Sequence, residues 1–225
     1  MNIVKVEDTG AQFNVRPGTL DEYVVKECYG KMYFDEYIKY RPEDVVLDVG
    51  ANIGAYSVRV SKHVTAVHSY EASPENYEVA LKNIELNSAR NVHLHNLALV
   101  GTDVKTLDFF LNTGKNKGAH SLLVKRGREK QTVNAYRFSK ALQESKATMV
   151  KMDIEGGEWD IFSNDTIDWT GVRGFVFEWH HAILRDKTYE KRKWLEEYLK
   201  KHFDNVIMPQ KLNSSWTILV RATKN

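Results

Sequence analysis

The sequence has little cysteine, proline or glycine: one Cys, four Pro and 13 Gly among 225 residues. A single thiol, Cys28, forms no intrachain disulfide, which excludes a disulfide-stabilised scaffold and fits a reducing compartment. A lone cysteine is also more often a packing residue than a nucleophile. With so few prolines and glycines, long disordered stretches are not expected.

Long apolar runs and an excess of one charge are missing as well. No stretch approaches the roughly 18 apolar residues that cross a bilayer, and the first ten residues lack the basic start and apolar run of a secretory signal. The formal net charge is +2, whereas dedicated nucleic-acid binders usually carry a stronger basic excess. We therefore expect a cytoplasmic globular protein with no membrane partner.

Short apolar runs alternate with amphipathic stretches, the pattern of βαβ units and a parallel sheet. It predicts an α/β fold, with a doubly wound, seven-stranded, mostly parallel sheet whose last strand is antiparallel. Strands are expected over residues 45–49, 65–70, 91–99, 104–111, 148–154 and 175–179, with a closing antiparallel pair at 205–208 and 216–221. Helices are expected from residue 54 onward and over 21–40, 74–87 and 189–202. We divide the chain into an N-terminal helical cap (1–40) and a cofactor-binding domain (41–225).

The sharpest motif is DVGANIG at residues 48–54, directly after an expected strand and at the start of a helix. Gly50 permits a tight turn and lets a ligand approach the backbone, and Gly54 allows close packing where the helix begins. Glu71 ends the next strand, about 20 residues on, where a carboxylate accepts hydrogen bonds from ribose hydroxyls. Together these features predict a site for a nucleoside-containing cofactor.

The spacing of the glycines favours S-adenosylmethionine over NAD. The dinucleotide fingerprint G-x-G-x-x-G fits a pyrophosphate onto a helix N-terminus, but here Asn52 stands between Gly50 and Gly54. S-adenosylmethionine has no phosphate and ends in an ammonium and a carboxylate. A strand-end acid such as Asp48, together with free backbone N–H groups, suits that end of the molecule.

Acids and histidines follow two later strands. Ligands of open α/β sheets bind beyond the carboxyl ends of the strands, where the sequence places Asp153 and Glu155 on one strand and Glu178 and His180 on the next. Methyl transfer from sulfonium to oxygen needs alignment and removal of the hydroxyl proton. We predict these four residues as catalytic. His180 is the leading base, because an imidazole is near half-neutral at physiological pH, and Asp153 holds the cofactor's ammonium or the acceptor.

Each of these residues also has a structural interpretation. Asp153 could cap the following helix, Glu158 fits its first turn, where it would complement the helix dipole, and His180 could be a partly buried structural histidine. Asp153, Glu178 and His180 together could form a divalent-ion site. The sequence shows no recognisable metal-ligand spacing, so no metal site is predicted.

Several blocks of the sequence resemble the FkbM family of methyltransferases: VVLDVGANIGAYS (45–57), HSYEASPENYEVALKNIELN (68–87), NVHLHNLAL (91–99), FEWH (177–180) and, most distinctive, KMDIEGGE (151–158), which is similar to the family's K-x-D-x-E-G-x-E signature. One departure is AYRF (135–138), where the family usually shows a threonine-leucine-aspartate turn. The resemblance implies a Rossmann-like class I fold and O-methylation with S-adenosylmethionine and no obligatory metal. It adds Asn96 and Ala98 to the expected cofactor contacts, which also include Ala72 and Asp153.

Three hypotheses for the function follow. The leading one is an O-methyltransferase that acts on a hydroxyl of a sugar, glycan or other small molecule. The second is a nucleic-acid methyltransferase, suggested by the basic run KRGREK (125–130) and the glycine-containing loop 112–120. The third is a non-catalytic module that binds S-adenosylmethionine.

Overall fold

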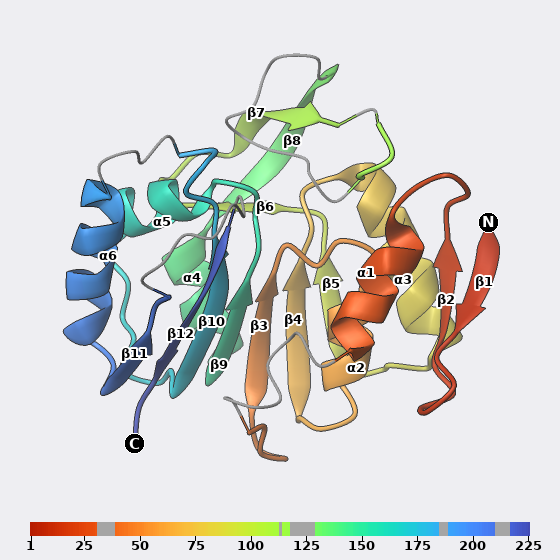
Figure 1. The fold of residues 1–225 in the computed structure, drawn as a ribbon, viewed down its shortest axis with the longest axis horizontal. Coiled ribbons are helices and arrows are strands. Elements are labelled where there is room, and N and C mark those ends of the chain that lie inside the picture. Colours follow the sequence, from red (N-terminus) through yellow and green to blue (C-terminus); the bar gives the residue numbers. More distant parts are fainter. Residues whose placement is uncertain (31–38, 113, 118–128, 185–188, 210–216) are drawn as a thin grey trace.

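The computed structural model of the chain describes residues 1–30, 39–112, 114–117, 129–184, 189–209 and 217–225 (Figure 1). Its strands are β1 (Asn2–Lys5), β2 (Gln12–Val15), β3 (Val45–Val49), β4 (Ala66–Tyr70), β5 (Val92–His95), β6 (Ala98–Val100), β7 (Thr106–Leu111), β8 (Glu129–Arg137), β9 (Met149–Met152), β10 (Gly174–Trp179), β11 (Asn205–Ile207) and β12 (Ile218–Thr223). Its helices are α1 (Asp21–Tyr29), α2 (Ala55–Val60), α3 (Pro74–Leu86), α4 (Phe138–Ser145), α5 (Glu158–Asn164) and α6 (Glu190–Lys200).

A seven-stranded sheet forms the centre of the molecule, in the order β11-β12-β10-β9-β3-β4-β5. Its inner pairs are parallel, and β12 is antiparallel to both of its neighbours. This confirms the predicted fold class and the closing antiparallel pair. The strand order also places β3 in the middle of the sheet, so the loop that follows it lies at the centre of the edge where the parallel strands end.

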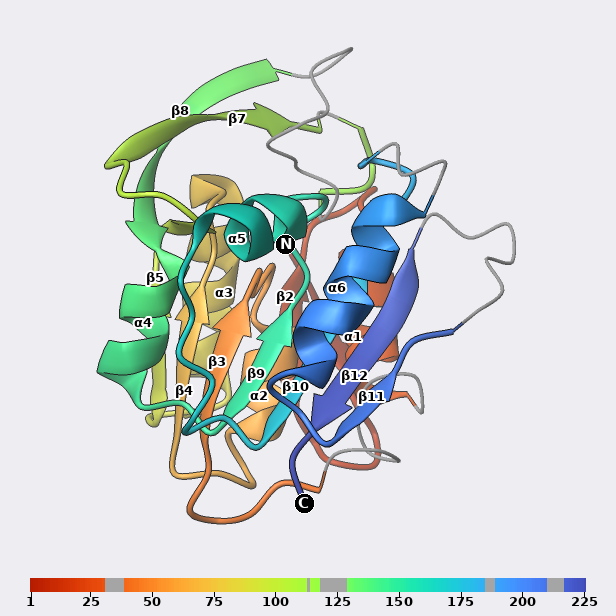
Figure 2. The same ribbon diagram turned by 90° about the vertical axis from the view of Figure 1, so that its left-hand side faces the viewer.

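Helices cover both faces of this sheet (Figures 1 and 2). One hydrophobic cluster joins the sheet to α4, α5 and α6, and the other joins it to α1, α2, α3 and the strand β2. Within β3, Leu47 and Val49 belong to the first cluster and Val46 to the second. Burial on both faces explains why the central strands appear in the sequence as nearly continuous apolar runs.

The N-terminal segment differs from the predicted helical cap. Residues 2–15 form an antiparallel hairpin, β1–β2, and only Asp21–Tyr29 of the expected helix over 21–40 is helical as α1, while 31–38 lie outside the described residues. Asn83 of α3 and Asn87, the C-cap residue of this helix, fasten the hairpin. Asn83 accepts a hydrogen bond from the backbone N–H of Asn14 (2.6 Å), and Asn87 does the same for Gln12 (3.0 Å) and donates to its carbonyl (2.6 Å). These side-chain amides thus bond backbone groups of β2 that a third strand would otherwise pair with.

The expected single strand over 91–99 is wrong, because the chain leaves the sheet at Asn96. The Asn96 amide donates to the carbonyls of Glu71 (2.8 Å) and Ala72 (3.2 Å), which separates β5 from β6. β6 pairs instead with β8, a strand that was not predicted, and β8 pairs with β7. This small sheet rises above the carboxyl ends of the parallel strands (Figures 1 and 2).

The AYRF segment, where the sequence departs from the family pattern, lies at the junction of β8 and α4. No side chain of the segment caps α4. The carboxylate of Asp165 does so from a distant position: it accepts a hydrogen bond from the Ser139 N–H (2.8 Å) and pairs with Arg137 (2.8 Å).

Among the described helices, none has both the length and the apolar character needed to cross a bilayer.

Candidate active site

The loop after β3 is a tight turn built on left-handed backbone. Gly50 (φ 84°), Asn52 (φ 52°) and Gly54 (φ 78°) all lie in that region. A Cβ at Gly50 would stand 1.9 Å from the carbonyl oxygen of Asp153, so this position requires glycine. A Cβ at Gly54 would meet Ala80 of α3 at 3.3 Å, so Gly54 serves packing between helices, as predicted, and lines none of the pockets described below.

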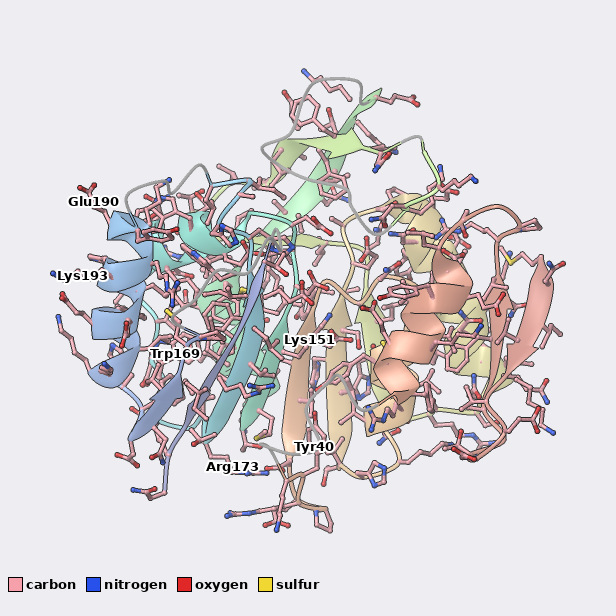
Figure 3. The ribbon with its side chains drawn as sticks, in the orientation of Figure 1. Tyr40, Lys151, Trp169, Arg173, Glu190 and Lys193 are labelled. Atoms are coloured by element: carbon pink, nitrogen blue, oxygen red, sulfur yellow. The ribbon has the colours of Figure 1, made fainter. Side chains whose placement is uncertain are left out.

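Asp48 lies beneath this loop rather than in a pocket. Its side chain is fully buried, accepts a hydrogen bond from Ser57 Oγ (2.6 Å) and pairs with Lys151 Nζ (3.1 Å), which lies in the middle of the molecule (Figure 3). Lys151 also donates to the carbonyl of Gly50 (2.7 Å). Asp48 lines neither of the two pockets described below, its charge is balanced by Lys151, and the pair supports the glycine loop from below. Its direct contact with the cofactor's ammonium stays a prediction.

Glu71 lies at the end of β4, beside the loop, as predicted. Its carboxylate accepts hydrogen bonds from the backbone N–H groups of Asn52 (2.8 Å) and Ser73 (2.8 Å). Burial raises the pKa of Glu71 to about 7, although these two hydrogen bonds act in the opposite direction. A carboxylate has about four acceptor sites on its two oxygens, so the group is suited to accept further hydrogen bonds from a diol.

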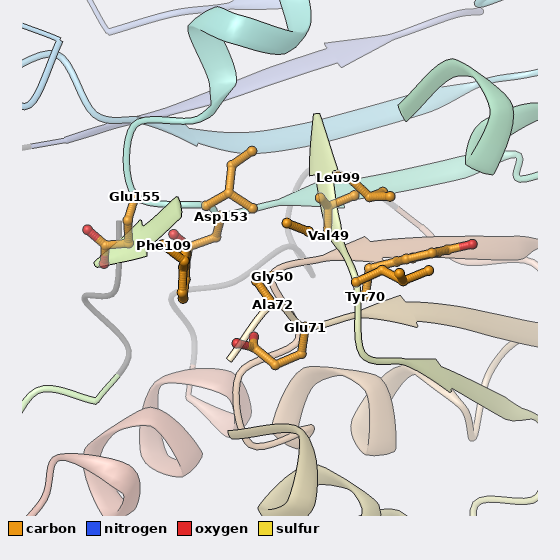
Figure 4. Close-up of a pocket in the computed structure, with 12 residues that line it drawn as sticks. Val49, Gly50, Tyr70, Glu71, Ala72, Leu99, Phe109, Asp153 and Glu155 are labelled. Carbon is orange, nitrogen blue, oxygen red and sulfur yellow. The ribbon is translucent and has the colours of Figure 1, made fainter. Parts of the chain in front are cut away.

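A pocket of about 490 Å³ opens beside Glu71 (Figure 4). In Figure 4, Gly50 lies between Glu71 and Asp153. Predicted site residues on its wall are Gly50, Glu71, Ala72, Ala98, Asp153 and Glu155, and apolar residues complete it: Val49, Tyr70, Leu97, Leu99, Phe109 and Ile154. Asn96 does not line this pocket, because its amide is used by two backbone carbonyls. An apolar pocket with one buried carboxylate fits an adenosine group.

A second pocket, of about 460 Å³, lies on the other side of the glycine loop and shares Gly50 and Asp153 with the first. Asn52 lines it, and its Oδ1 atom is buried without a hydrogen-bond partner among the described residues. Glu27 of α1 also lines it, and burial raises the pKa of that carboxylate, with a smaller contribution from Asp153. An unpaired carbonyl oxygen beside two acids fits an ammonium group.

The two pockets therefore match the two ends of S-adenosylmethionine, and Asp153 lies where they meet. When bound, the cofactor supplies an electrophilic methyl group on a sulfonium. The residues that would hold it are Glu71 and Ala98 at the nucleoside end, and Asn52 and Glu27 at the amino-acid end. Glu27 was missed by sequence analysis, since an acid on an amphipathic helix gives no sign of the pocket it faces.

His180 is surrounded by carboxylates. Its Nδ1 lies 2.8 Å from Glu158, and its Nε2 lies 3.7 Å from Asp153, 3.5 Å from Glu155 and 3.9 Å from Glu178. The structure thus brings the four predicted catalytic residues together. Glu158 lies in the first turn of α5, as expected, but it is fully buried and orients the imidazole ring.

The surroundings of His180 do not favour its predicted role as the base. Burial opposes a charge on the ring, but Glu158, Glu155 and Asp153 outweigh it and hold the pKa of His180 well above its usual range. The free enzyme therefore keeps a protonated imidazole near neutral pH, which has no lone pair for a substrate proton. Burial and the neighbouring acids raise the pKa of Glu155, in spite of His180.

The Methyltransferase FkbM domain model matches residues 48–203. Among solved structures, the FkbM methyltransferase of Methylobacillus flagellatus KT is 16% identical, with 88% of this chain and 47% of that chain covered at a TM-score of 0.50. The precorrin-6y C5,15-methyltransferase of Geobacter metallireducens GS-15 is 12% identical over 94% of this chain and 93% of that one, at a TM-score of 0.49. An rRNA methylase from Streptococcus thermophilus is 8% identical over 82% and 89%, at 0.47. No curated protein matches the chain.

The family match begins at Asp48, the first residue of the glycine motif, and extends through both strands that carry the acids and His180. It covers well over half of the chain. The chain therefore belongs to the FkbM methyltransferase family and uses S-adenosylmethionine as its cofactor.

Proposed function

We propose that this protein transfers the methyl group of S-adenosylmethionine to a hydroxyl group of a sugar or another small-molecule acceptor. One observation carries the proposal: Asp153 lines both cofactor pockets and also belongs to the carboxylate cluster around His180. A proton-accepting group therefore lies beside the point where the two halves of the cofactor meet.

The reaction needs a proton acceptor and alignment. The acceptor hydroxyl gives its proton to one of the carboxylates Asp153, Glu155 or Glu178, and its oxygen attacks the methyl carbon. The carbon–sulfur bond breaks, and its electron pair stays on the sulfur of S-adenosylhomocysteine. His180 does not take the proton in this scheme. Its positive charge keeps several acids together in one place, and the raised pKa of Glu155 suits that carboxylate to general-base catalysis.

The charge of the site favours an uncharged acceptor over a nucleic acid. Asp153, Glu155 and Glu178 lie around His180, and such a surface repels a phosphate backbone. The basic run that suggested nucleic acid lies mostly outside the described residues. Its last residue, Lys130, lies on β8 and pairs with Asp108 at 2.8 Å.

An acceptor screen tests the proposal. The protein and S-adenosylmethionine are incubated with neutral monosaccharides, oligosaccharides, phosphorylated sugars and tRNA, and methylated products are identified by mass spectrometry. We expect an O-methyl product from an uncharged hydroxyl compound and a large loss of turnover in Asp153→Asn, with Glu190→Gln of the exposed face of α6 as the matched control. Methylation of tRNA alone would replace the proposal with the nucleic-acid hypothesis. Tight cofactor binding without any product would favour the non-catalytic module.

A further inference from the structure

Two carboxylates and one imidazole point their ligand atoms at the same small space. Asp153, Glu155 and His180 each offer one such atom, and these atoms all lie within 4.8 Å of one another. The two carboxylates follow β9, and His180 follows β10, the neighbouring parallel strand. We propose that this cluster is a binding site for a divalent transition-metal ion such as Mn²⁺ or Zn²⁺.

The first argument is the position of the Nε2 atom of His180. The side chain is 97% buried, since its exposed fraction is 3%, and its other ring nitrogen, Nδ1, contacts Glu158. A single charge-assisted hydrogen bond would bring Nε2 to about 2.7–2.9 Å from one carboxylate. Nε2 instead stands 3.5–3.9 Å from three carboxylates. It faces the space between them rather than any one of them.

The second argument is the spacing of these atoms. Ligands about 2.1 Å from an ion stand roughly 3.0 Å apart in an octahedral arrangement and roughly 3.4 Å apart in a tetrahedral one. The separations of 3.5 Å from Glu155 and 3.7 Å from Asp153 are slightly longer. Carboxylates that repel one another before an ion binds are expected to be spread in this way.

The third argument is Glu158, which lies behind the imidazole. It is fully buried and lies 2.8 Å from the Nδ1 atom of His180. A histidine that binds a metal ion commonly donates its other ring N–H to a carboxylate, which fixes the tautomer and the ring orientation. Glu158 also accepts hydrogen bonds from the backbone N–H groups of Ile154 (3.4 Å) and Gly156 (3.3 Å). One carboxylate therefore orients both His180 and the loop that carries Asp153 and Glu155.

The ligand set indicates the class of ion. The ion displaces the Nε2 proton of His180 when it binds. One imidazole nitrogen with two carboxylate oxygens suits Mn²⁺, Fe²⁺ or Zn²⁺, whereas Ca²⁺ and Mg²⁺ prefer oxygen alone. Three protein ligands leave coordination positions open for a further molecule. On the basis of the proposed function, that molecule would be the acceptor hydroxyl, whose pKa an ion would lower.

Metal binding is measured without cofactor or acceptor, so that the result does not depend on the proposed function. The full chain is freed of metal with a chelator and titrated with Mn²⁺, and the electron paramagnetic resonance signal of the free ion is followed. We expect about one bound ion per chain and competition by Zn²⁺. Glu155→Gln and Asp153→Asn should each weaken binding at least about tenfold, whereas Glu144→Gln, on the exposed face of α4, should bind like the wild type.

A second readout guards against variants that fail to fold. In the wild-type protein, bound Mn²⁺ should broaden the imidazole NMR signals of His180 and leave those of the exposed His63 unchanged. Absence of Mn²⁺ and Zn²⁺ binding at millimolar concentration, or equal binding by wild type, Glu155→Gln and Asp153→Asn, would overturn the metal site. Full O-methyl transfer in the presence of chelator would overturn the role of the ion in the reaction and leave the proposed function intact. Metal binding by a protein that methylates no hydroxyl would support the metal site and overturn the proposed function.

Discussion

Lys151 Nζ and Asp48 Oδ1 lie 3.1 Å apart on adjacent strands, both buried directly beneath the glycine loop. Removing one member of such a pair leaves the other charge buried and uncompensated, which costs about 3–5 kcal/mol of the free energy of unfolding. We expect this loss in Lys151→Met and in Asp48→Asn, measured by urea unfolding. The double variant should lose less than the sum of the two.

The exposed pair Lys26–Glu22 on α1 provides the matched control. Its two residues lie four positions apart on a helix, where such a pair contributes about 0.5 kcal/mol or less. Lys26→Met should therefore change the free energy of unfolding very little. Additive losses in the Lys151 and Asp48 variants would show that the buried pair is not coupled.

Stability should depend on pH through Glu71. Its pKa is about 7 in the folded protein and near 4.3 in an unfolded chain, so the folded state binds the proton more tightly. The stabilisation is complete below pH 4.3, decreases as pH rises, and is lost above about pH 7. Relative to Glu71→Gln, the wild type should lose roughly 3 kcal/mol across this window. Parallel pH profiles in the two proteins would contradict this.

Cofactor binding should depend on pH in the opposite direction. Ribose hydroxyls donate hydrogen bonds, and the ionised Glu71 carboxylate accepts them better than the protonated acid does. By calorimetry, the affinity of the wild type for S-adenosylmethionine should increase as pH rises toward about 7 and then level off. Glu71→Gln should bind roughly tenfold more weakly or worse and show a flat profile. A wild-type affinity that is independent of pH would show that Glu71 does not contact the ribose.

Gly50→Ala should abolish cofactor binding and destabilise the fold. The new Cβ would stand 1.9 Å from the Asp153 carbonyl oxygen, on backbone with φ 84°, so strain and overlap together should cost about 3 kcal/mol or more. Gly171→Ala is the matched control, because a Cβ there meets nothing within 4 Å. Thermal unfolding and cofactor titration of both variants test this, and equal behaviour would refute the steric argument.

Asn83→Ala should release the N-terminal hairpin. The change removes the acceptor of the Asn14 N–H and the donor to the Ile53 carbonyl (2.9 Å). An unsatisfied buried group costs about 1–3 kcal/mol, so we expect a total loss of roughly 2–4 kcal/mol and faster hydrogen exchange in β2. Asn205→Ala, at an exposed position of β11, should stay within about 0.5 kcal/mol of the wild type.

The centre of the fold was predictable because its local signals agree. In β3 a short β-branched run is followed at once by Gly50 and Gly54, and after β4 the helix α3 begins with Ser73 as N-cap and Pro74 at the first position. Each of these signals depends on neighbours in the sequence. The strand end at Glu71 then follows from chain order in a parallel sheet.

The missed elements depend on contacts that the sequence does not display. β8 is charged and mostly exposed on alternate residues, and the hairpin β1–β2 is short, with Asn2, Lys5, Gln12 and Asn14 among its eight residues. The run 91–99 alternates without interruption, and its break at Asn96 is caused by two carbonyls 24 and 25 residues away.

The same dependence on contacts that the sequence does not display explains which features of the site could be predicted. Residue types and strand order predicted that Asp153, Glu155, Glu178 and His180 would meet, because parallel strands end at one edge of the sheet. The protonation state of His180 depends on its burial and on Glu158, which reaches the ring from the next helix at 2.8 Å. The proximity of these residues was therefore predictable from the sequence, whereas the charge state of His180, which its three-dimensional surroundings determine, was not.

The fastening of the hairpin by α3 has a consequence for synthesis of the chain. The hairpin is made first, but its amide partners Asn83 and Asn87 come 69 and 75 residues after Asn14 and Gln12. At ribosomal rates of about 5–20 residues per second, the hairpin waits roughly 4–15 s for them. A lone two-stranded hairpin is only marginally stable in water. The edge of β2 is therefore open to other nascent chains until α3 leaves the ribosome.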